Sequence, residues 1–179
     1  MIPSLTDVLC TRCGLCCDGS LFADVELAGD DEATALEVMG LEIEDADGDD
    51  GALLLQPCRA LKGKRCGIYP HRPECCRTFE CRLLQEVRRG ALGVEQAKET
   101  IAEALKRIKR VNELIVQLGE GNEGLPLKER CADALALSVD AATDSAVNRK
   151  RAELQVAMNS VESLVQETFL APPAKKGSD

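Results

Sequence analysis

The chain has 179 residues, of which 45% are hydrophobic, so it is long enough for one compact domain with a hydrophobic core. Aromatic residues make up only 2%, so this core must consist mostly of Leu, Val, Ile and Ala, which favours helices over an all-β sandwich. The net charge of −9 argues against non-specific binding to nucleic acid or to an anionic membrane, and we expect neither partner.

We expect a cytoplasmic protein. The first residues lack the basic and apolar regions of a signal peptide, and no run reaches the roughly 18 apolar residues that a membrane helix requires. The chain contains ten cysteines, and in a reducing compartment this number favours metal binding over structural disulfides.

The first half of the chain is rich in cysteine and turn residues, and it is predicted to form few regular elements. Alternation of apolar and polar residues predicts short strands at 21–27 and 52–57, and an acidic first turn predicts a helix at 30–40. Asp and Gly dominate 42–51, which indicates a polar loop, and the prolines of 58–73 indicate coil.

The second half of the chain is predicted to be helical. Helices are predicted at 79–90, 93–119, 127–142 and 147–170, and the tail 171–179 is expected to be disordered. In the second of these helices, apolar or small residues recur at alternating steps of 3 and 4, which is a heptad seam: Val94, Ala97, Ile101, Ala104, Ile108, Val111, Ile115 and Leu118. Such a seam serves either a bundle within the chain or a coiled coil with a partner.

The predicted fold is therefore mainly α, in two parts. A small, irregular, metal-stapled, cysteine-rich domain with a few short strands is expected at 1–90. A helical hairpin or bundle is expected at 91–170, before the tail at 171–179.

Nine of the ten cysteines fall in two clusters that suit metal binding. The first is the run CTRCGLCC, and the second holds Cys58, Cys66, Cys75, Cys76 and Cys81. Cys-x-x-Cys places two thiolates on one tight turn, where both can reach one metal. Zinc takes four such ligands in a tetrahedron, and C-x₂-C-x₂-C also opens iron–sulfur cubane sites, so both metals stay open.

The adjacent cysteines Cys16 and Cys17 point in different directions in either a strand or a helix. They fit one mononuclear site poorly, which favours either a polynuclear site or two neighbouring sites that take one of them each. Eight thiols would suit two four-coordinate sites. Cys76 and Cys81 lie five residues apart, so a metal shared by them would require an irregular chain around 74–80.

The pattern of both clusters resembles the YkgJ-type cysteine-cluster (CxxCxxCC) family, which carries C-x-x-C-x-x-C-C, then P-C, C-x-I-Y and R-P-x-x-C-R-x-F-x-C. The resemblance covers roughly residues 10–81 and implies a zinc- or iron-chelating domain with these metal ligands: Cys10, Cys13, Cys16, Cys17, Cys58, Cys66, Cys76 and Cys81. Further matching positions are Tyr69, Arg72, Pro73, Arg77 and Phe79. A similar cysteine pattern occurs in flagellin lysine methylases, where it implies an iron–sulfur cluster, but this chain shows no recognisable S-adenosylmethionine loop.

The remaining cysteines, the histidine and the basic residues near the clusters are not predicted to be metal ligands. Cys75 departs from the family pattern, and we read it as a bystander rather than an alternative ligand or redox thiol. Cys131 fits a buried free cysteine in a helix. The single histidine, His71, could be a ligand or a proton carrier. Because the chain has only this one histidine, Ser-His or Cys-His catalysis is not expected. Residues 59–89 contain nine Lys or Arg, of which Arg77 could either balance thiolate charge or belong to a solvated face.

The sequence therefore predicts a protein that binds zinc or iron through eight thiolates. The metal would be mainly structural, and the C-terminal helices would offer a surface to a protein partner or to a second copy. The alternative is an iron–sulfur protein that carries electrons or supports a modifying enzyme such as a protein methylase. The chain lacks a cofactor motif and paired carboxylates, so we favour a protein without catalysis of its own.

Overall fold

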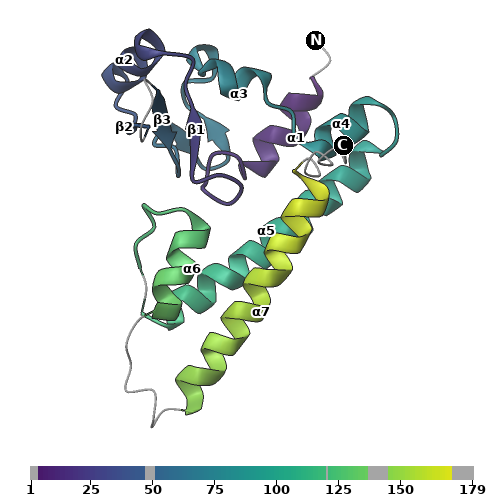
Figure 1. Ribbon diagram of the computed structural model, residues 1–179. Helices are drawn as coiled ribbons and strands as arrows, with labels where there is room; N and C mark the ends of the chain where they lie inside the picture. Colours follow the sequence, from purple (N-terminus) through teal and green to yellow (C-terminus); the bar gives the residue numbers. More distant parts are fainter. Residues whose placement is uncertain (1–3, 47–50, 120, 137–144, 171–179) are drawn as a thin grey trace, which may run out of the picture.

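The computed structural model describes residues 4–46, 51–119, 121–136 and 145–170. Within them the chain is mainly helical with a few short strands, which confirms the predicted fold class. Figure 1 shows the long helices α5 (Val94–Gln117) and α7 (Ser145–Thr168) side by side, with the strand-containing part of the chain near one end of the pair. No helix in the described ranges is long and apolar enough to cross a bilayer.

Helices α5 and α7 run antiparallel. Arg107 Nη1 of α5 donates to Ser160 Oγ of α7 at 3.0 Å, and Arg110 Nη2 donates to Glu153 Oε2 at 3.1 Å, so residues further along α5 meet residues earlier in α7. The heptad seam is largely buried in the hydrophobic core that α5 shares with α7 and the other helices, at Ala97, Ile101, Ala104, Ile108, Val111 and Ile115. The seam is thus used inside the chain, as expected for a bundle.

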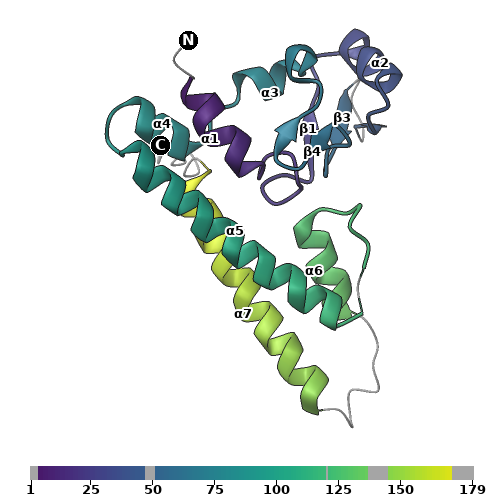
Figure 2. The same cartoon turned by 180° about the vertical axis from the view of Figure 1, so that it is seen from behind.

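Three shorter helices pack around this pair: α1 (Leu5–Cys13), α4 (Arg82–Arg88) and α6 (Leu127–Ala136). Figure 2 shows α4 at one end of α5 and α6 beside its other half. All five helices share one hydrophobic core, called the helical core here, with buried members such as Leu9, Leu84, Ile108, Leu154 and Phe169. The predicted domain boundary near residue 90 stays a prediction; Leu9 and Leu15 of the N-terminal segment belong to the helical core.

Helix α1 was not predicted, and the structure corrects the view that the first cysteines lie on a tight turn alone. Ser4 Oγ accepts a hydrogen bond from Asp7 N at 3.1 Å, and Asp7 Oδ2 accepts one from Ser4 N at 3.1 Å. This reciprocal capping box satisfies two backbone donors at the helix start. The spacing Ser4-x-x-Asp7 before Val8 and Leu9 was the signal for this helix in the sequence.

A second, smaller core forms around a three-stranded antiparallel sheet with the order β1 (Asp24–Glu26), β3 (Ala52–Leu55) and β2 (Ile43–Asp45). Helix α2 (Asp30–Val38) packs against β3. This sheet core comprises Leu27, Ala33, Leu36, Leu41, Ala52, Leu54 and Ala60. Strands within 21–27 and 52–57 and a helix within 30–40 were predicted, whereas β2 lies in a segment that was predicted to be a loop.

The segment after β3, predicted as coil, holds short elements. Strands β4 (Leu61–Lys62) and β5 (Arg65–Cys66) form a hairpin, followed by a 3₁₀ turn, η1 (Tyr69–His71), and a short helix, α3 (Glu74–Thr78). The helix predicted at 79–90 begins only at Arg82, because Phe79 and Cys81 are extended. The predicted helix at 127–142 is described only to Ala136, and the predicted tail at 171–179 lies outside the described residues.

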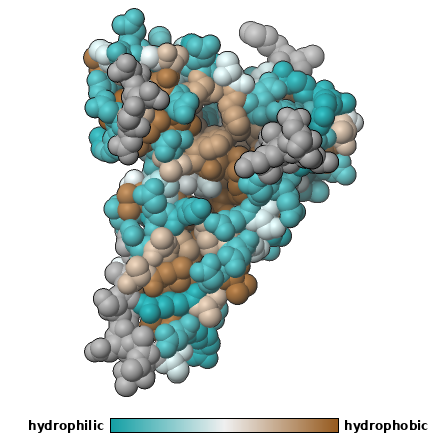
Figure 3. Space-filling model, viewed as in Figure 1, coloured by the Kyte–Doolittle hydropathy of each residue, from teal (hydrophilic) through white to brown (hydrophobic). Residues whose placement is uncertain are grey.

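A cleft of about 660 Å³ lies between the chain at 19–23 and helices α6 and α7. Its lining includes apolar side chains from both sides, among them Phe22, Met158, Val161 and Leu170. Figure 3 shows apolar surface in the hollow between the strand-containing part and the helices. The backbone that follows Cys17 therefore borders this cleft.

Candidate metal centre

The first cysteines lie at the C-terminal end of α1 and in the turn that follows it. Cys10 and Cys13 occupy the last turn of the helix, and Gly14 ends it at φ 77°. This left-handed conformation is easily reached only by glycine, and it directs the chain into the turn that carries Cys16 and Cys17. Cys17 N donates to Gly14 O at 2.9 Å, which closes the turn.

Backbone hydrogen bonds join Cys17 to the second cysteine cluster. Cys58 N donates to Cys17 O at 2.8 Å, and Leu61 N donates to Cys58 O at 2.9 Å. Leu61 is paired with Cys66 across the β4–β5 hairpin. Cys17, Cys58 and Cys66 are therefore brought together although 49 positions separate the first from the last in sequence (66 − 17).

The turn around Cys17 is also fixed to the helices. Leu127 N, at the start of α6, donates to Gly19 O at 3.0 Å. Gly19 has φ 77°, and a Cβ added there would lie 3.0 Å from Pro126 Cα. Only glycine allows this close approach, so the cysteine-bearing turn is held against the N-terminal end of α6.

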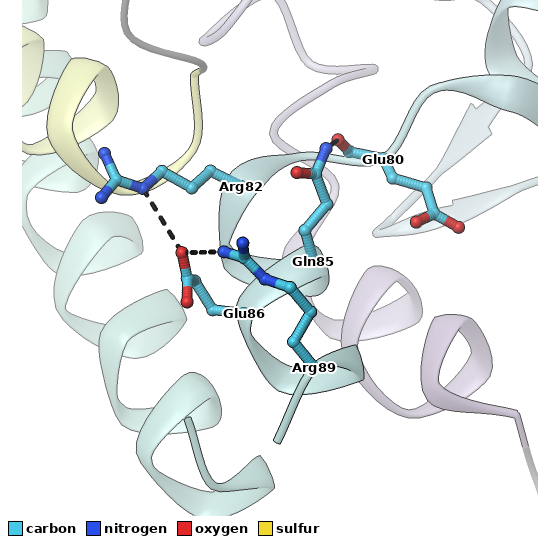
Figure 4. A network of polar contacts seen from close by, with 5 residues as sticks. All are labelled: Glu80, Arg82, Gln85, Glu86 and Arg89. Atoms are coloured by element: carbon cyan, nitrogen blue, oxygen red, sulfur yellow. Dashed lines mark hydrogen bonds and ion pairs between the residues drawn. The ribbon is translucent and has the colours of Figure 1, made fainter. Parts of the chain in front are cut away.

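Cys76 and Cys81 lie on two different elements. Cys76 is in α3, Cys81 caps the start of α4, and the extended residues between them break the helix. Figure 4 shows the polar contacts that hold α4: Glu86 contacts Arg82 and Arg89, and Gln85 Nε2 donates to Glu80 O at 2.7 Å. Arg82 N also donates to Phe169 O at 2.9 Å, which ties the segment beside Cys81 to the end of α7.

Cys10, Cys13 and Cys16 each have a pKa that an ionised Cys81 would raise, and we call these four residues the first thiol set. Cys10 is exposed on one side, but the protein packed around its other side displaces water and raises its pKa to about 11, and the charge of Cys81 raises it as well. Burial raises the pKa of Cys13 to about 12, with further increases from Cys81 and Cys10. Burial also raises the pKa of Cys16, followed by the charges of Cys13, Cys17, Cys81 and Cys10. Like charges act this way only at short range.

The remaining family cysteines, Cys17, Cys58, Cys66 and Cys76, form the second thiol set. Burial raises the pKa of Cys17 to about 12, and the charges of Cys58 and Cys66 raise it next. Burial, and then the charge of Cys66, raises the pKa of Cys58. The pKa of Cys76 is raised first by its contact with Cys75 and by burial, and then by the charges of Cys75, Cys17 and Cys58. Between the sets, Cys17 raises the pKa of Cys16, and Cys10 raises the pKa of Cys17.

Packing divides the thiols in the same way. Cys13 and Cys81 pack against the helical core, whereas Cys58 and Cys66 pack against the sheet core. The two sets meet at the Cys16–Cys17 peptide bond. Nearby, the rings of Phe22 and Phe79 pack edge to face with centroids 5.2 Å apart, joining the chain after Cys17 to the chain between Cys76 and Cys81.

The thiols fit zinc or iron in their chemistry. All ten cysteines are free thiols. Among the described residues, no three His, Cys, Asp or Glu side chains converge closely enough to hold one metal ion. A zinc–sulfur bond is only about 2.3 Å long. The cysteine side chains would therefore have to rotate before the four sulfur atoms of either set could bind one metal ion.

The other candidate residues lie apart from these groups or at their edges. Cys75 Sγ lies 4.0 Å from Cys76 Sγ and packs against the sheet core. Cys131 is 3% exposed in the helical core, which confirms the prediction of a buried free cysteine. His71 and Arg77 are exposed. Phe22 was not predicted to lie near the cysteines, and the only signal for it was its place five residues after Cys17 in a chain with few aromatics.

Comparison with known proteins identifies the family. No curated protein and no solved structure matches the chain. A family model with the description "CxxCxxCC: Putative zinc- or iron-chelating domain" matches residues 9–112, which is more than half of the chain and includes both thiol sets. The chain belongs to this CxxCxxCC family of zinc- or iron-chelating domains.

Proposed function

We propose that the two thiol sets bind two metal ions, one in each set, and that the metal is mainly structural. The observation that carries this proposal is the agreement between charge and packing. Cys81 raises the pKa of Cys13, and both pack against the helical core. Cys58 and Cys66 raise the pKa of Cys17, and these two pack against the sheet core. Four thiolates complete the coordination of one zinc or iron ion.

The adjacent pair supports two sites rather than one. Besides Cys17, the cysteines that raise the pKa of Cys16 are Cys13, Cys81 and Cys10. The pKa of Cys17 is raised mainly by Cys58 and Cys66, and Cys17 in turn raises the pKa of Cys76. Neighbouring side chains point in different directions, so each can serve a different metal without distortion of the chain. The eight ligands would be Cys10, Cys13, Cys16 and Cys81 at one site, and Cys17, Cys58, Cys66 and Cys76 at the other.

A structural role follows from what the two sites would join. The first set connects α1 to α4, and the second connects the turn after α1 to β5 and α3. The sheet core is small, with seven buried hydrophobic residues among those that the structure describes. Small cores commonly depend on metal or disulfide crosslinks for stability, and metal binding to thiolates is then coupled to folding.

An iron–sulfur cluster in the first set is the second candidate. Cys10, Cys13 and Cys16 have the C-x₂-C-x₂-C spacing that is typical of cubane sites, and Cys10 is exposed. An exposed edge would suit electron exchange. In that case the protein would carry electrons or support a modifying enzyme such as a protein methylase.

Metal and acid-labile sulfide content would test these proposals on protein purified anaerobically without a metal-affinity column. About two zinc or iron ions per chain without sulfide would support two four-thiolate sites. Iron and sulfide in equal amounts, with a brown colour, would support the cluster. A chain without bound metal after reconstitution with either ion would contradict both.

Metal binding should also release protons. The pKa values of about 11 for Cys10 and about 12 for Cys13 and Cys17 keep these thiols protonated at pH 7. Each ligand must lose its proton to bind, so we expect about four protons per metal and an affinity that rises with pH. Calorimetric titration of the metal-free chain at pH 7, in buffers with different ionisation enthalpies, measures this number. Release near zero would mean that thiols are not the ligands.

The partner predicted for the C-terminal helices stays a prediction. The seam of α5 is largely buried in the helical core, so any partner or second copy would have to bind other faces of these helices. The cytoplasmic location and the absence of catalysis are likewise retained as expectations.

A further inference from the structure

We propose that a surface groove between α5 and α7 binds helix α2 of a second copy of this chain. This interface is separate from the proposed metal centre, because none of the described residues that line the groove is a cysteine. The groove lies on a face of the long helices that remains available when the heptad seam is buried in the helical core.

The groove is open and largely apolar at its base. It has a volume of about 670 Å³, and its lining includes Leu114 of α5 and Ala152, Val156 and Ala157 of α7. Val156 is 69% exposed, whereas Leu154 on the same helix is fully buried. An apolar hollow with charged residues around it is typical of a surface that binds a helix of another protein chain.

The charges of the groove favour an acidic occupant. Among the described residues, three arginines line the groove, Arg107, Arg110 and Arg149, together with one glutamate, Glu153. Arg107 donates to Ser160 and Arg110 donates to Glu153, so both guanidinium groups are held across the two helices. Arg149 is exposed and forms no ion pair with any residue that the structure describes. Two such grooves placed face to face would bring arginines together, which disfavours a groove-to-groove dimer.

Helix α2 carries the charge and the apolar side chains that such an occupant needs. Asp31 and Val38 lie seven positions apart and therefore share the side of the helix that faces away from the sheet core. Val38 is 85% exposed and Met39, just after the helix, is 44% exposed. Asp30, Asp31 and Glu37 are exposed and form no ion pair within the described part of the chain. The exposed side of α2 thus complements the groove in both charge and hydrophobicity.

The α2 helix that fills the groove must come from another copy. Within one chain α2 packs against the sheet, and Figures 1 and 2 show it at the outer end of the strand-containing part, apart from α5 and α7. If two copies fill each other's grooves, they form a closed dimer. If only one groove is filled, a free α2 and a free groove remain, and further copies can add.

The test measures self-association of the full chain by sedimentation velocity over a wide range of protein concentrations. Val38→Asp changes α2, Val156→Asp changes the groove, and Val116→Asp is the matched control, because Val116 is 58% exposed on α5 but does not line the groove. The unsubstituted chain should self-associate. Val38→Asp and Val156→Asp should each weaken this association about tenfold or more, because a carboxylate buried in an apolar contact loses its water. Val116→Asp should associate like the unsubstituted chain.

A mixture of the two interface variants identifies the contact. Val38→Asp keeps an intact groove and Val156→Asp keeps an intact α2, so an equimolar mixture should form a dimer of one copy of each. Added sodium chloride should weaken the association, because the paired charges are exposed and salt screens them. If Val156→Asp does not fold, as judged by circular dichroism, Arg149→Glu replaces it as the groove variant and should pair with Val38→Asp in the same way.

Three results would overturn the proposal. The first is self-association of Val38→Asp alone at the strength of the unsubstituted chain, and the second is equal weakening by Val116→Asp. The third is an unsubstituted chain that stays monomeric up to millimolar concentration, which would exclude a second copy as the occupant. None of these results would affect the proposed function, because metal content is measured independently of association.

Discussion

Replacement of Cys13 by serine should remove one of two bound metal ions and destabilise the protein by several kcal/mol. Cys13 lies in the last turn of α1 and packs against the helical core, and its pKa is raised by burial and then by Cys81 and Cys10. A serine hydroxyl does not replace a thiolate ligand. Structural zinc in small peptides binds with about 10–16 kcal/mol, whereas whole domains are stable by only about 5–15 kcal/mol, so the loss of one metal is a large effect. Metal content and thermal unfolding measure it.

Cys131→Ala is the matched control for this experiment. Cys131 is also a cysteine packed in the helical core, but it lies in α6, outside both thiol sets. The alanine variant should keep both metals and lose only the small packing contribution of one sulfur atom. If Cys13→Ser kept full metal content and the melting behaviour of the unsubstituted chain, the first thiol set would not be a metal site.

Replacement of Leu154 by alanine should destabilise the metal-loaded protein by about 2–5 kcal/mol without loss of metal. Leu154 is fully buried on α7, at 0% exposure, in the core that α7 shares with α5. The substitution leaves a cavity there, whereas the thiols lie on other elements. Chemical denaturation followed by circular dichroism measures the free energy of unfolding, and metal analysis of the folded protein measures retention.

Val156→Ala provides the comparison on the same helix. Val156 is 69% exposed, so its truncation should change the free energy of unfolding by no more than about 0.5 kcal/mol. Equal losses in the two variants would contradict the packing of α7 on α5. A Leu154→Ala variant that lost metal would show that the thiol sets depend on the long helices more than their packing indicates.

The long helices could be predicted from the sequence because their apolar residues repeat with a clear helical period. The steps of 3 and 4 from Val94 to Leu118 suit only a helix with one buried face, and α5 occupies nearly that range. Helix α1 was not predicted because the Cys-x-x-Cys spacing is typical of a tight turn, although Ser4 and Asp7 marked the start of the helix. Strand β2 was missed because Glu44 and Asp45 are acidic; only its pairing with β3 makes it a strand.

For the candidate site, the adjacency of Cys16 and Cys17 favoured either a polynuclear site or two neighbouring sites, because adjacent side chains diverge in any regular structure. This division of the ligands stays a prediction. Which of the distant cysteines joins which group depends on tertiary contacts. Cys81 joins Cys10 and Cys13 because α4 packs against α1, and Cys58 joins Cys17 through one backbone hydrogen bond. Spacing along the chain contains no information on these contacts.

Metal content of Cys16→Ser, Cys17→Ser and the double variant tests the central claim of two separate sites most directly. If each residue serves a different metal, each single variant should retain one of two metals and the double variant should retain none. The two single variants should also differ in which site remains, as seen by cadmium-113 resonance spectra of the substituted protein. If both single variants and the double variant lost the same metal ion and kept the same other ion, Cys16 and Cys17 would share one site. That result would contradict the claim of two separate sites.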